Sequence, residues 1–239
     1  MSKFSVVLTS IMLLASSSAL RAEGPVKGVV ELFTSQGCSS CPPADTVFGG
    51  IIKQDGVIGL AWHVDYWDYL GWKDTFSLAE ATTRQRSYAQ ALNARNVYTP
   101  QIIVNGEKVA KNSNFSETIA SALDGALPVS VDMEVGADRV TVAAGEGDGE
   151  ANLVLVTYER MKDVNIERGE NSGSKITYYH AVSNVRTIGM WKGAAMSLEL
   201  PRSEYAPKKG QGCVVLLQRV VNGAPGAIIG AYMMDSPES

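Results

Sequence analysis

The chain has 239 residues, and 45% of them are hydrophobic, which is enough apolar material for a sizeable core. Its 25 acidic side chains outnumber the 21 basic ones, so the net charge is −4 and gives no electrostatic reason to bind nucleic acid. Three cysteines are too few for a small fold held together by disulfides. Stability must therefore come from packing, and a close cysteine pair is expected to perform chemistry.

The N-terminus has the pattern of a secretory signal. Lys3 precedes an apolar stretch over residues 4–14, and small residues follow it as far as Ala22. The apolar stretch is shorter than the roughly 20 residues that a membrane-spanning helix needs. We therefore predict a signal peptide over residues 1–22, cleaved after Ala19 or Ala22, and a periplasmic or secreted protein. No later segment suits a membrane span, so none is expected after cleavage.

Residues 23–127 alternate apolar strands with helical patterns, which is typical of an α/β domain. The expected elements are a strand at 29–34, a helix at 42–52, a strand at 57–64, a helix at 78–92, a hairpin at 102–110 and a helix at 115–127. Pro42 and Pro43 stand where a first helical turn tolerates missing amides. Ser77 and Glu80 form a capping-box pattern ahead of the second helix. The turn pair Asn105-Gly106 marks the hairpin.

The hydrophobic period changes at Pro128. Apolar residues then alternate with polar ones over 129–135, which is the pattern of a half-buried strand. Further strands are expected at 152–159, 175–184, 195–200, 213–221 and 227–233. Because no convincing helix interrupts them, we predict that residues 128–239 form a second domain, an antiparallel all-β sandwich or barrel. The absence of a long linker suggests that it packs on the first.

Cys38 and Cys41 lie where the first strand gives way to the first helix. Two thiols at this spacing can close a small disulfide, and helix amides can stabilise the thiolate that opens it. We expect Cys38 at the helix N-terminus as the exposed nucleophile and Cys41 as the inward-facing resolving thiol. A permanent disulfide is the alternative. Cys213, in the apolar run 213–217, is predicted to be a buried strand residue, with a resolving or metal-binding role as its alternative.

The cysteine motif and the segment Val97–Gly106 together resemble the thioredoxin superfamily. The resemblance implies that Thr99-Pro100 occupies the cis-proline position of that family, in a loop that faces the cysteines and hydrogen-bonds a bound peptide. A trans turn is the alternative. More closely, the chain resembles a family of exported bacterial thioredoxin-like proteins of unassigned function. That resemblance extends across the mature chain through Glu31–Cys38, His63–Asp68, Gly169–Asn171 and Tyr178–His180.

The chain departs from thioredoxin beside the cysteines. Gly37 stands where thioredoxin has tryptophan, and Ser39-Ser40 replaces its Gly-Pro dipeptide, so the redox direction stays open. Thioredoxin's buried strand aspartate aids proton transfer. The nearest acid here is Glu31, one residue farther from the motif, and it is either a proton shuttle or a solvated acid at a strand end.

A second dense cluster covers residues 63–72. It follows a strand that should lie parallel beside the cysteine strand, so His63 and Asp65 are predicted to emerge at the same sheet edge as Cys38. We expect this cluster to wall an active-site cleft, with Trp67 and Trp72 offering apolar surface to a client peptide. A packed loop with a satisfied histidine is the alternative.

These motifs predict an exported enzyme that exchanges dithiols and disulfides with protein clients. Cys38, Cys41 and Pro100 would be its catalytic residues, with Thr99 among the residues that bind the client. No nucleotide or flavin motif is visible, so no cofactor is expected and a partner must recycle the cysteines. One alternative is a copper(I) metallochaperone with Cys38, Cys41 and His63 as ligands. Another is a binding module in which the β-rich region engages a partner and the disulfide is structural.

Overall fold

A computed structural model describes residues 25–110 and 115–236. Strands and helices alternate in the first part of the chain, in the predicted order. The elements are β1 (Gly28–Thr34), α1 (Pro42–Ile51), β2 (Val57–His63), the short 3-10 helix η1 (Asp68–Leu70), α2 (Ala79–Ala91), β3 (Gln101–Val104), β4 (Lys108–Ala110) and α3 (Phe115–Ala122). The signal peptide predicted over residues 1–22 lies outside the described residues.

The second part of the chain is rich in strands, as the alternating pattern predicted. It contains β5 (Val131–Val135), β6 (Arg139–Ala144), β7 (Ala151–Asn165), β8 (Lys175–Trp191), β9 (Met196–Pro201), the single-turn helix α4 (Arg202–Tyr205), β10 (Gln211–Val221) and β11 (Ala224–Asp235). The observed β7 and β8 are considerably longer than predicted.

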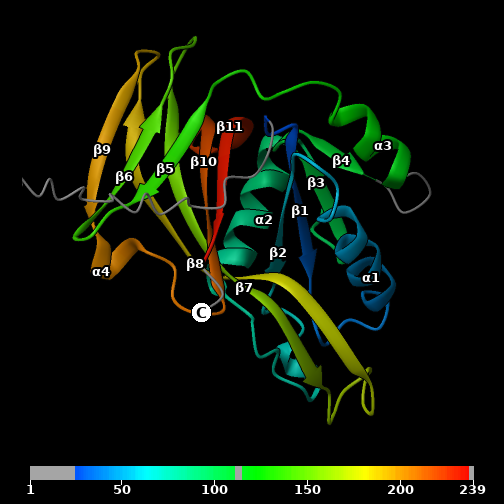
Figure 1. Cartoon of the computed structure of the whole chain (residues 1–239). Helices are drawn as coiled ribbons and strands as arrows, with labels where there is room; N and C mark the ends of the chain where they lie inside the picture. Colours follow the sequence, from blue (N-terminus) through cyan, green and yellow to red (C-terminus); the bar gives the residue numbers. More distant parts are fainter. Residues whose placement is uncertain (1–24, 111–114, 237–239) are drawn as a thin grey trace, which may run out of the picture.

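The strands form one large mixed sheet and one small antiparallel sheet (Figure 1). The large sheet has the order β11-β10-β7-β8-β2-β1-β3-β4, and the small one has the order β5-β6-β9. Strand β1 pairs in parallel with β2, and β2 in turn meets β8 in parallel at Ala61 and Ala181. The expectation of a separate sandwich is therefore corrected. Four C-terminal strands extend the N-terminal sheet, and only three form a second one.

Both faces of the large sheet are covered, which explains why its inner strands are apolar throughout. Val154 and Val156 of β7 join a core with α2, whereas Leu153 and Leu155 pack against β5 and β6 of the small sheet. Helices α1 and α3 cover that second face over β1 to β4. Strand β10 alternates in the same way, so Cys213 is buried among apolar side chains, as predicted.

The far ends of β7 and β8 form a hairpin arm that we define as residues 161–179. Pairing of β7 with β10 ends at Glu159, while pairing with β8 continues from Met161 opposite Tyr179 to Asn165 opposite Lys175. Figure 1 shows this arm projecting away from the rest of the sheet, on the side where η1 lies. Residues far along the chain are thereby brought beside the loop that follows β1.

Candidate functional site

The site is built around a disulfide between Cys38 and Cys41 in the turn that joins β1 to α1. The Cys41 backbone N–H donates to the Cys38 carbonyl at 3.2 Å. Cys41 is the N-cap, and Pro42 and Pro43 are the first helical residues. The predicted position of Cys38 is thus corrected: it lies in the turn before the helix, because the helix begins at the prolines, whose fixed φ suits a first turn.

The two sulfur-bearing residues are nearly enclosed. Cys38 has 3% of its surface exposed and Cys41 has none, whereas Ser39 and Ser40 between them are exposed. The Ser40 hydroxyl lies 3.4 Å from Cys38 Sγ, so the exposed part of the turn brings a polar group into contact with that sulfur. The expectation that Cys38 is the exposed residue of the pair is therefore wrong.

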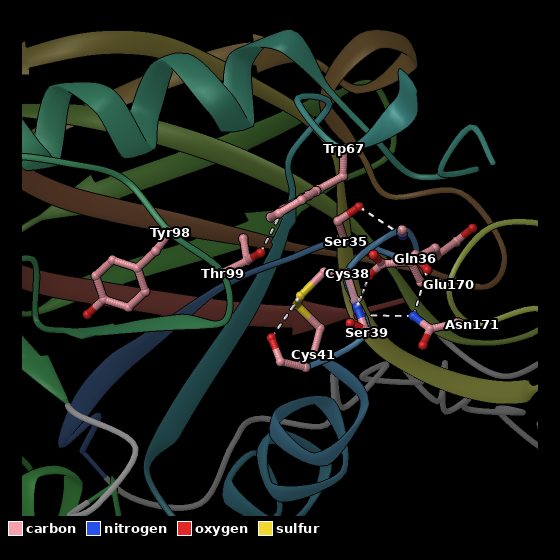
Figure 2. The surroundings of a disulfide bond; sticks show 12 residues. Ser35, Gln36, Cys38, Ser39, Cys41, Trp67, Tyr98, Thr99, Glu170 and Asn171 are labelled. Atoms are coloured by element: carbon pink, nitrogen blue, oxygen red, sulfur yellow. Dashed lines mark hydrogen bonds between the residues drawn. A yellow bond between two sulfur atoms is a disulfide. The ribbon is translucent and has the colours of Figure 1, made fainter. Parts of the chain in front are cut away.

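Trp67 and the loop ahead of β3 lie beside the disulfide (Figure 2). A Cβ placed on Gly37 would come within 3.2 Å of Trp67 Cβ, so the tryptophan packs directly against the residue preceding Cys38. Its indole N–H donates to Thr99 Oγ1 at 2.8 Å. The Thr99–Pro100 peptide bond is cis. The structure thus brings Trp67, Thr99 and the cysteine loop together at one place.

Gln85 of α2 holds the loop ahead of β3 in place by hydrogen bonds. Sequence reasoning did not single out this residue. Its amide N–H groups donate to the Tyr98 carbonyl and to Gln101 Oε1, each at 2.8 Å. Its own Oε1 accepts the Tyr66 hydroxyl at 3.1 Å. These three side-chain hydrogen bonds serve the two segments that flank the disulfide, and the residue is completely buried.

His63 does not wall an open cleft, which corrects the prediction for this residue. Its side chain is completely buried, with Nδ1 2.7 Å from Asp74 Oδ2. The rings of Phe76 and Tyr178 meet it edge-on, at centroid distances of 5.2 and 5.0 Å. The alternative, a packed loop with a satisfied histidine, describes His63 only in part: Nδ1 is paired with Asp74, but the buried Nε2 has no hydrogen-bond partner among the described residues.

Asp65 is also turned away from the cysteines. Its Oδ1 accepts a hydrogen bond from the Thr82 hydroxyl at 2.6 Å, and its backbone N–H donates to Thr82 Oγ1 at 3.2 Å. These bonds tie the end of β2 to α2. The shared sheet edge was predicted from strand order, but strand order does not determine where a side chain points.

His63 and Asp74 form a charged pair inside the protein. Burial by itself lowers the pKa of His63. The Asp74 carboxylate 2.7 Å away raises it by more than burial lowers it, so the net shift of the pKa is upward. Burial likewise raises the pKa of Asp74, but His63 and the backbone amides of Gln36 and Phe76 bring it below its usual value. Each partner therefore favours the charged form of the other, the imidazolium of His63 and the carboxylate of Asp74.

Asp45 lies one helical turn beyond Cys41, on the same face of α1. It is buried, and burial raises the pKa of its carboxyl to about 7 although His63 lowers it. Within the described part of the chain, four buried polar atoms of this neighbourhood have no hydrogen-bond partner: Thr34 Oγ1, Asp45 Oδ2, His63 Nε2 and Tyr178 OH. The Asp45 carboxyl, which can exchange a proton near neutral pH, therefore lies one helical turn beyond the buried Cys41.

Glu31 belongs to a different buried network. Its Oε1 accepts from Arg84 Nε at 2.7 Å, and its Oε2 accepts from the Tyr88 hydroxyl. Arg84 also donates to Gln218 of β10 at 2.9 Å. Glu31 alternates along β1 with Val30 and Leu32, which face α1, so its side chain points to the α2 face. It is a paired core residue, neither a solvated acid nor a neighbour of Asp45.

Trp72 supports the cysteine loop through Gln36. The indole N–H of Trp72 donates to Gln36 Oε1 at 2.8 Å, and the Gln36 backbone N–H donates to Asp74 Oδ2 at the same distance. Gln36 and Asp74 were missed by sequence reasoning, since polar residues in a loop carry no periodic signal. Asn171 and Glu170, on the arm, complete the surroundings of the disulfide (Figure 2). Their motif stood out in the sequence, but no role could be given to it.

The residues proposed for copper(I) are not arranged as a metal site. In the described ranges, no group of three or more His, Cys, Asp and Glu side chains is placed to hold a metal ion. The two sulfurs are bonded to each other, and His63 uses Nδ1 for Asp74. The third cysteine is remote from the pair: Cys213 contacts Met133 Sδ at 3.6 Å, and burial raises the pKa of its thiol to about 12.

The fold and site define a mixed α/β protein with a buried disulfide at the start of its first helix. The chain belongs to the DUF1223 family, described as proteins of unknown function, whose model matches residues 29–218. A crystal structure of a protein from Agrobacterium tumefaciens is 42% identical, covers 91% of this chain and 98% of its own, and has a TM-score of 0.82. HBP35 of Porphyromonas gingivalis shares the fold at 16% identity, with a TM-score of 0.63 over 89% of this chain and 76% of its own. No curated protein matches the chain. Among its described helices, none is long and apolar enough to cross a membrane.

Proposed function

We propose that this protein is an exported thiol-disulfide oxidoreductase with a thioredoxin-like N-terminal region, acting on protein cysteines in the periplasm or outside the cell. The observation that carries the proposal is the Cys38–Cys41 disulfide, closed in the turn between a central strand and a helix and flanked by the Thr99 loop. The order of strands and helices through residue 122 supports the thioredoxin-like assignment. So do the two sequence motifs, which stand in the order expected for that superfamily.

The chemistry begins with the reduced pair. The Cys38 thiolate attacks one sulfur of a client disulfide, forms a mixed disulfide and releases the first client thiolate. The Cys41 thiolate then attacks Cys38 Sγ, which closes the intramolecular disulfide and releases the second client thiolate. The two electrons gained by the client are those lost by the cysteine pair. A partner dithiol restores the reduced state, and the same steps in reverse oxidise a client.

Asp45 suits the second step better than Glu31 does. A buried thiol must lose its proton before it can attack, and Cys41 is completely buried. The Asp45 carboxyl follows it by one helical turn, and its pKa of about 7 lets it take up a proton near neutral pH and return it later. We assign Asp45 as the group that accepts the Cys41 proton, in place of the Glu31 shuttle considered from the sequence.

Client binding is assigned to the surface beside the cysteines. Trp67 is half-buried against Gly37, and Tyr98, with 44% of its surface exposed, precedes Thr99 in the neighbouring loop. An extended client segment would lie against these rings, with the Thr99 loop offering backbone groups to it. His63 and Asp65 have no part in this surface, because both are engaged elsewhere.

A structural disulfide in a binding module is the second candidate, and the burial of Cys38 favours it. The deciding experiment is a titration of the Cys38–Cys41 pair in thiol buffers, with Cys38→Ser as control. A reduction potential of about −120 to −180 mV supports an oxidant or isomerase, and about −270 mV supports a reductant. A pair that resists reduction below about −300 mV overturns the catalytic proposal and supports a structural disulfide.

A further inference from the structure

The tip of the β7–β8 arm holds the cysteine turn by direct hydrogen bonds. The Asn171 amide donates to the Gln36 and Cys38 carbonyls, each at 2.9 Å. The neighbouring Glu170 accepts the Ser39 backbone N–H through Oε2 at 3.3 Å. Figure 2 shows both side chains reaching the turn. More than 130 positions of sequence separate these residues, so the contact exists only because the arm projects beyond β10.

We propose that the arm tip controls how readily the Cys38–Cys41 disulfide opens, with Glu170 opposing the reduced form and Asn171 positioning the turn. The biological use of this control rests on the proposed oxidoreductase function, but the effect itself is a property of the cysteine pair. Glu170 and Asn171 are positioning residues, because they bond backbone groups of the turn, the Ser39 N–H and the Cys38 carbonyl.

The role of Glu170 depends on which backbone N–H groups near Cys38 are free to stabilise its thiolate. Reduction adds two electrons and two protons to the disulfide and passes through a Cys38 thiolate, which amides at a helix start normally stabilise. Pro42 and Pro43 have no N–H, and the Ser39 N–H already points at Glu170. The carboxylate therefore occupies the amide of the residue that follows Cys38 and places a negative charge at the cysteine turn, and a like charge disfavours the thiolate. Disfavouring the reduced form makes the disulfide harder to reduce.

Glu170 differs from the other ionisable groups around the disulfide. Asp45 and the His63–Asp74 pair are buried behind the turn, on α1, β2 and the loop that precedes α2. Glu170 is exposed and arrives from a separate element. Its charge can therefore be removed without leaving a buried group unpaired.

Asn171 has a mechanical role. Its two donated bonds hold the carbonyls of Gln36 and Cys38 together across the turn, and Gly169 packs against Trp72 at the base of the same tip. A thiol that opens the disulfide must reach a sulfur, and Cys38 is only 3% exposed, so we expect the turn to shift before the reaction. A turn clamped at its first cysteine resists that movement, so we expect Asn171 to slow the reaction of the pair.

The test for Glu170 is Glu170→Gln in the mature chain, with Glu167→Gln as the matched control because that exposed glutamate lies on the same arm. Glu170→Gln should make reduction by glutathione more favourable by about threefold to tenfold, a tenfold change being about 30 mV. The difference should shrink in about 1 M salt, where exposed charges are screened. Glu170→Asp keeps the charge and should stay near wild type. A shift no larger than that of Glu167→Gln overturns the role of Glu170.

Two further measurements complete the test. In a Cys41→Ser background, the pH at which Cys38 becomes reactive toward iodoacetamide should fall in Glu170→Gln and stay unchanged in Glu167→Gln. Asn171→Ala should speed reduction of the intact disulfide by dithiothreitol, and an unchanged rate overturns the positioning role. None of these readouts needs a client. A shift without client turnover therefore refutes the proposed function alone, and turnover without a shift refutes this inference alone.

Discussion

At the scale of single residues, the unusual feature of this site is the concentration of buried polar groups behind the disulfide. Asp45, His63, Asp74 and Tyr178 all lie close together, and several of their polar atoms have no partner among the described residues. Such groups cost stability unless they are compensated, so they are expected where a protein needs their chemistry. Because Asp45 follows Cys41 by one helical turn, we propose that this chemistry acts on the Cys41 thiol.

Asp45→Asn should change how stability depends on pH. The folded protein keeps the Asp45 proton up to about pH 7, whereas the unfolded chain releases it near 3.8. Between those values the folded state binds more protons, so the free energy of unfolding falls as pH rises. The asparagine variant lacks this fall and should gain a few kcal/mol on wild type between pH 4 and pH 8. Denaturant unfolding at pH 4 and pH 8 measures this difference, with exposed Asp55→Asn as the control. If the free energy of unfolding changes with pH equally in wild type and Asp45→Asn, the raised pKa of Asp45 is refuted.

His63→Ala should be strongly destabilising near neutral pH. It leaves the Asp74 carboxylate buried without its cation, and removing one member of a buried pair costs about 3–5 kcal/mol. The raised pKa of His63 means that its contribution is present below the unfolded value of 6.5 and is lost as pH rises through the folded value. The lowered pKa of Asp74 means that its contribution is lost in acid.

The measurement for His63→Ala is the free energy of unfolding across pH 3 to 9, compared with wild type. Its deficit should be largest between the two titrations and should shrink in acid, where Asp74 takes up a proton. The double variant His63→Leu with Asp74→Leu should recover part of the loss, because it leaves no charge behind. A deficit that does not vary with pH would mean that packing, and not the pair, dominates.

The residue scale also shows where sequence reasoning stops. It could identify Cys38, Cys41, Thr99 and Trp67, since a motif and its neighbours lie on short loops joined to strongly apolar strands. It could not identify Asp45, which looks like any acid in a first helical turn. Its burial depends on β8 crossing behind α1, and nothing local in the sequence reports that contact.

At the scale of elements, α2 is the support of both loops beside the disulfide. Gln85 reaches the 98–101 loop, and Thr82 holds the end of β2. The capping box predicted for α2 is wrong: the helix begins at Ala79, and the Ser77 hydroxyl donates to Asp68 Oδ2 and the Asp74 carbonyl. The serine stabilises the loop that carries Asp74, because its hydroxyl bonds two acceptors of that loop and does not cap the helix.

Gln85→Met tests this support. The methionine fills a similar volume but leaves the Tyr98 carbonyl and the Gln101 side chain without their buried donor. Unsatisfied buried groups cost about 1–3 kcal/mol each, so the free energy of unfolding should fall by a few kcal/mol. Hydrogen exchange should rise in the 98–101 loop first. Thr83→Val, on the exposed face of α2, is the control, and equal protection of the loop in both variants would contradict the role given to Gln85.

At the scale of the whole molecule, the two stretches of sequence divided at residue 128 share one sheet. Strands β7, β8, β10 and β11 come from the second stretch and complete the core that begins with Phe33 and Trp62. Periodicity located these strands well, because alternation reports burial of a face. It could not tell which sheet they join, because a pleated strand shows the same alternation against any partner.

The buried network of Glu31 connects the same two stretches. Arg84 bonds Glu31 on β1 and Gln218 on β10, and the Gln218 amide donates to the Tyr88 hydroxyl at 2.7 Å and the Gly226 carbonyl at 2.8 Å. These bonds are inside the core, where an unpaired member is costly. The first stretch therefore lacks part of its own interior when it is separated from the second.

We accordingly expect residues 23–127 alone to lack a cooperative fold. The fragment would expose the edge of β2 that meets β8, leave Arg84 without Gln218 and open the apolar face that packs on Val154 and Val156. The chain without its predicted signal peptide, residues 23–239, should unfold in a single thermal transition by circular dichroism, whereas the fragment should show none and should exchange its β2 amides quickly. A fragment that unfolds sharply near the temperature of the mature chain would show instead that the first stretch is an independent domain. The β-rich part would then be an addition to the domain that carries the disulfide and would not be needed for its folding.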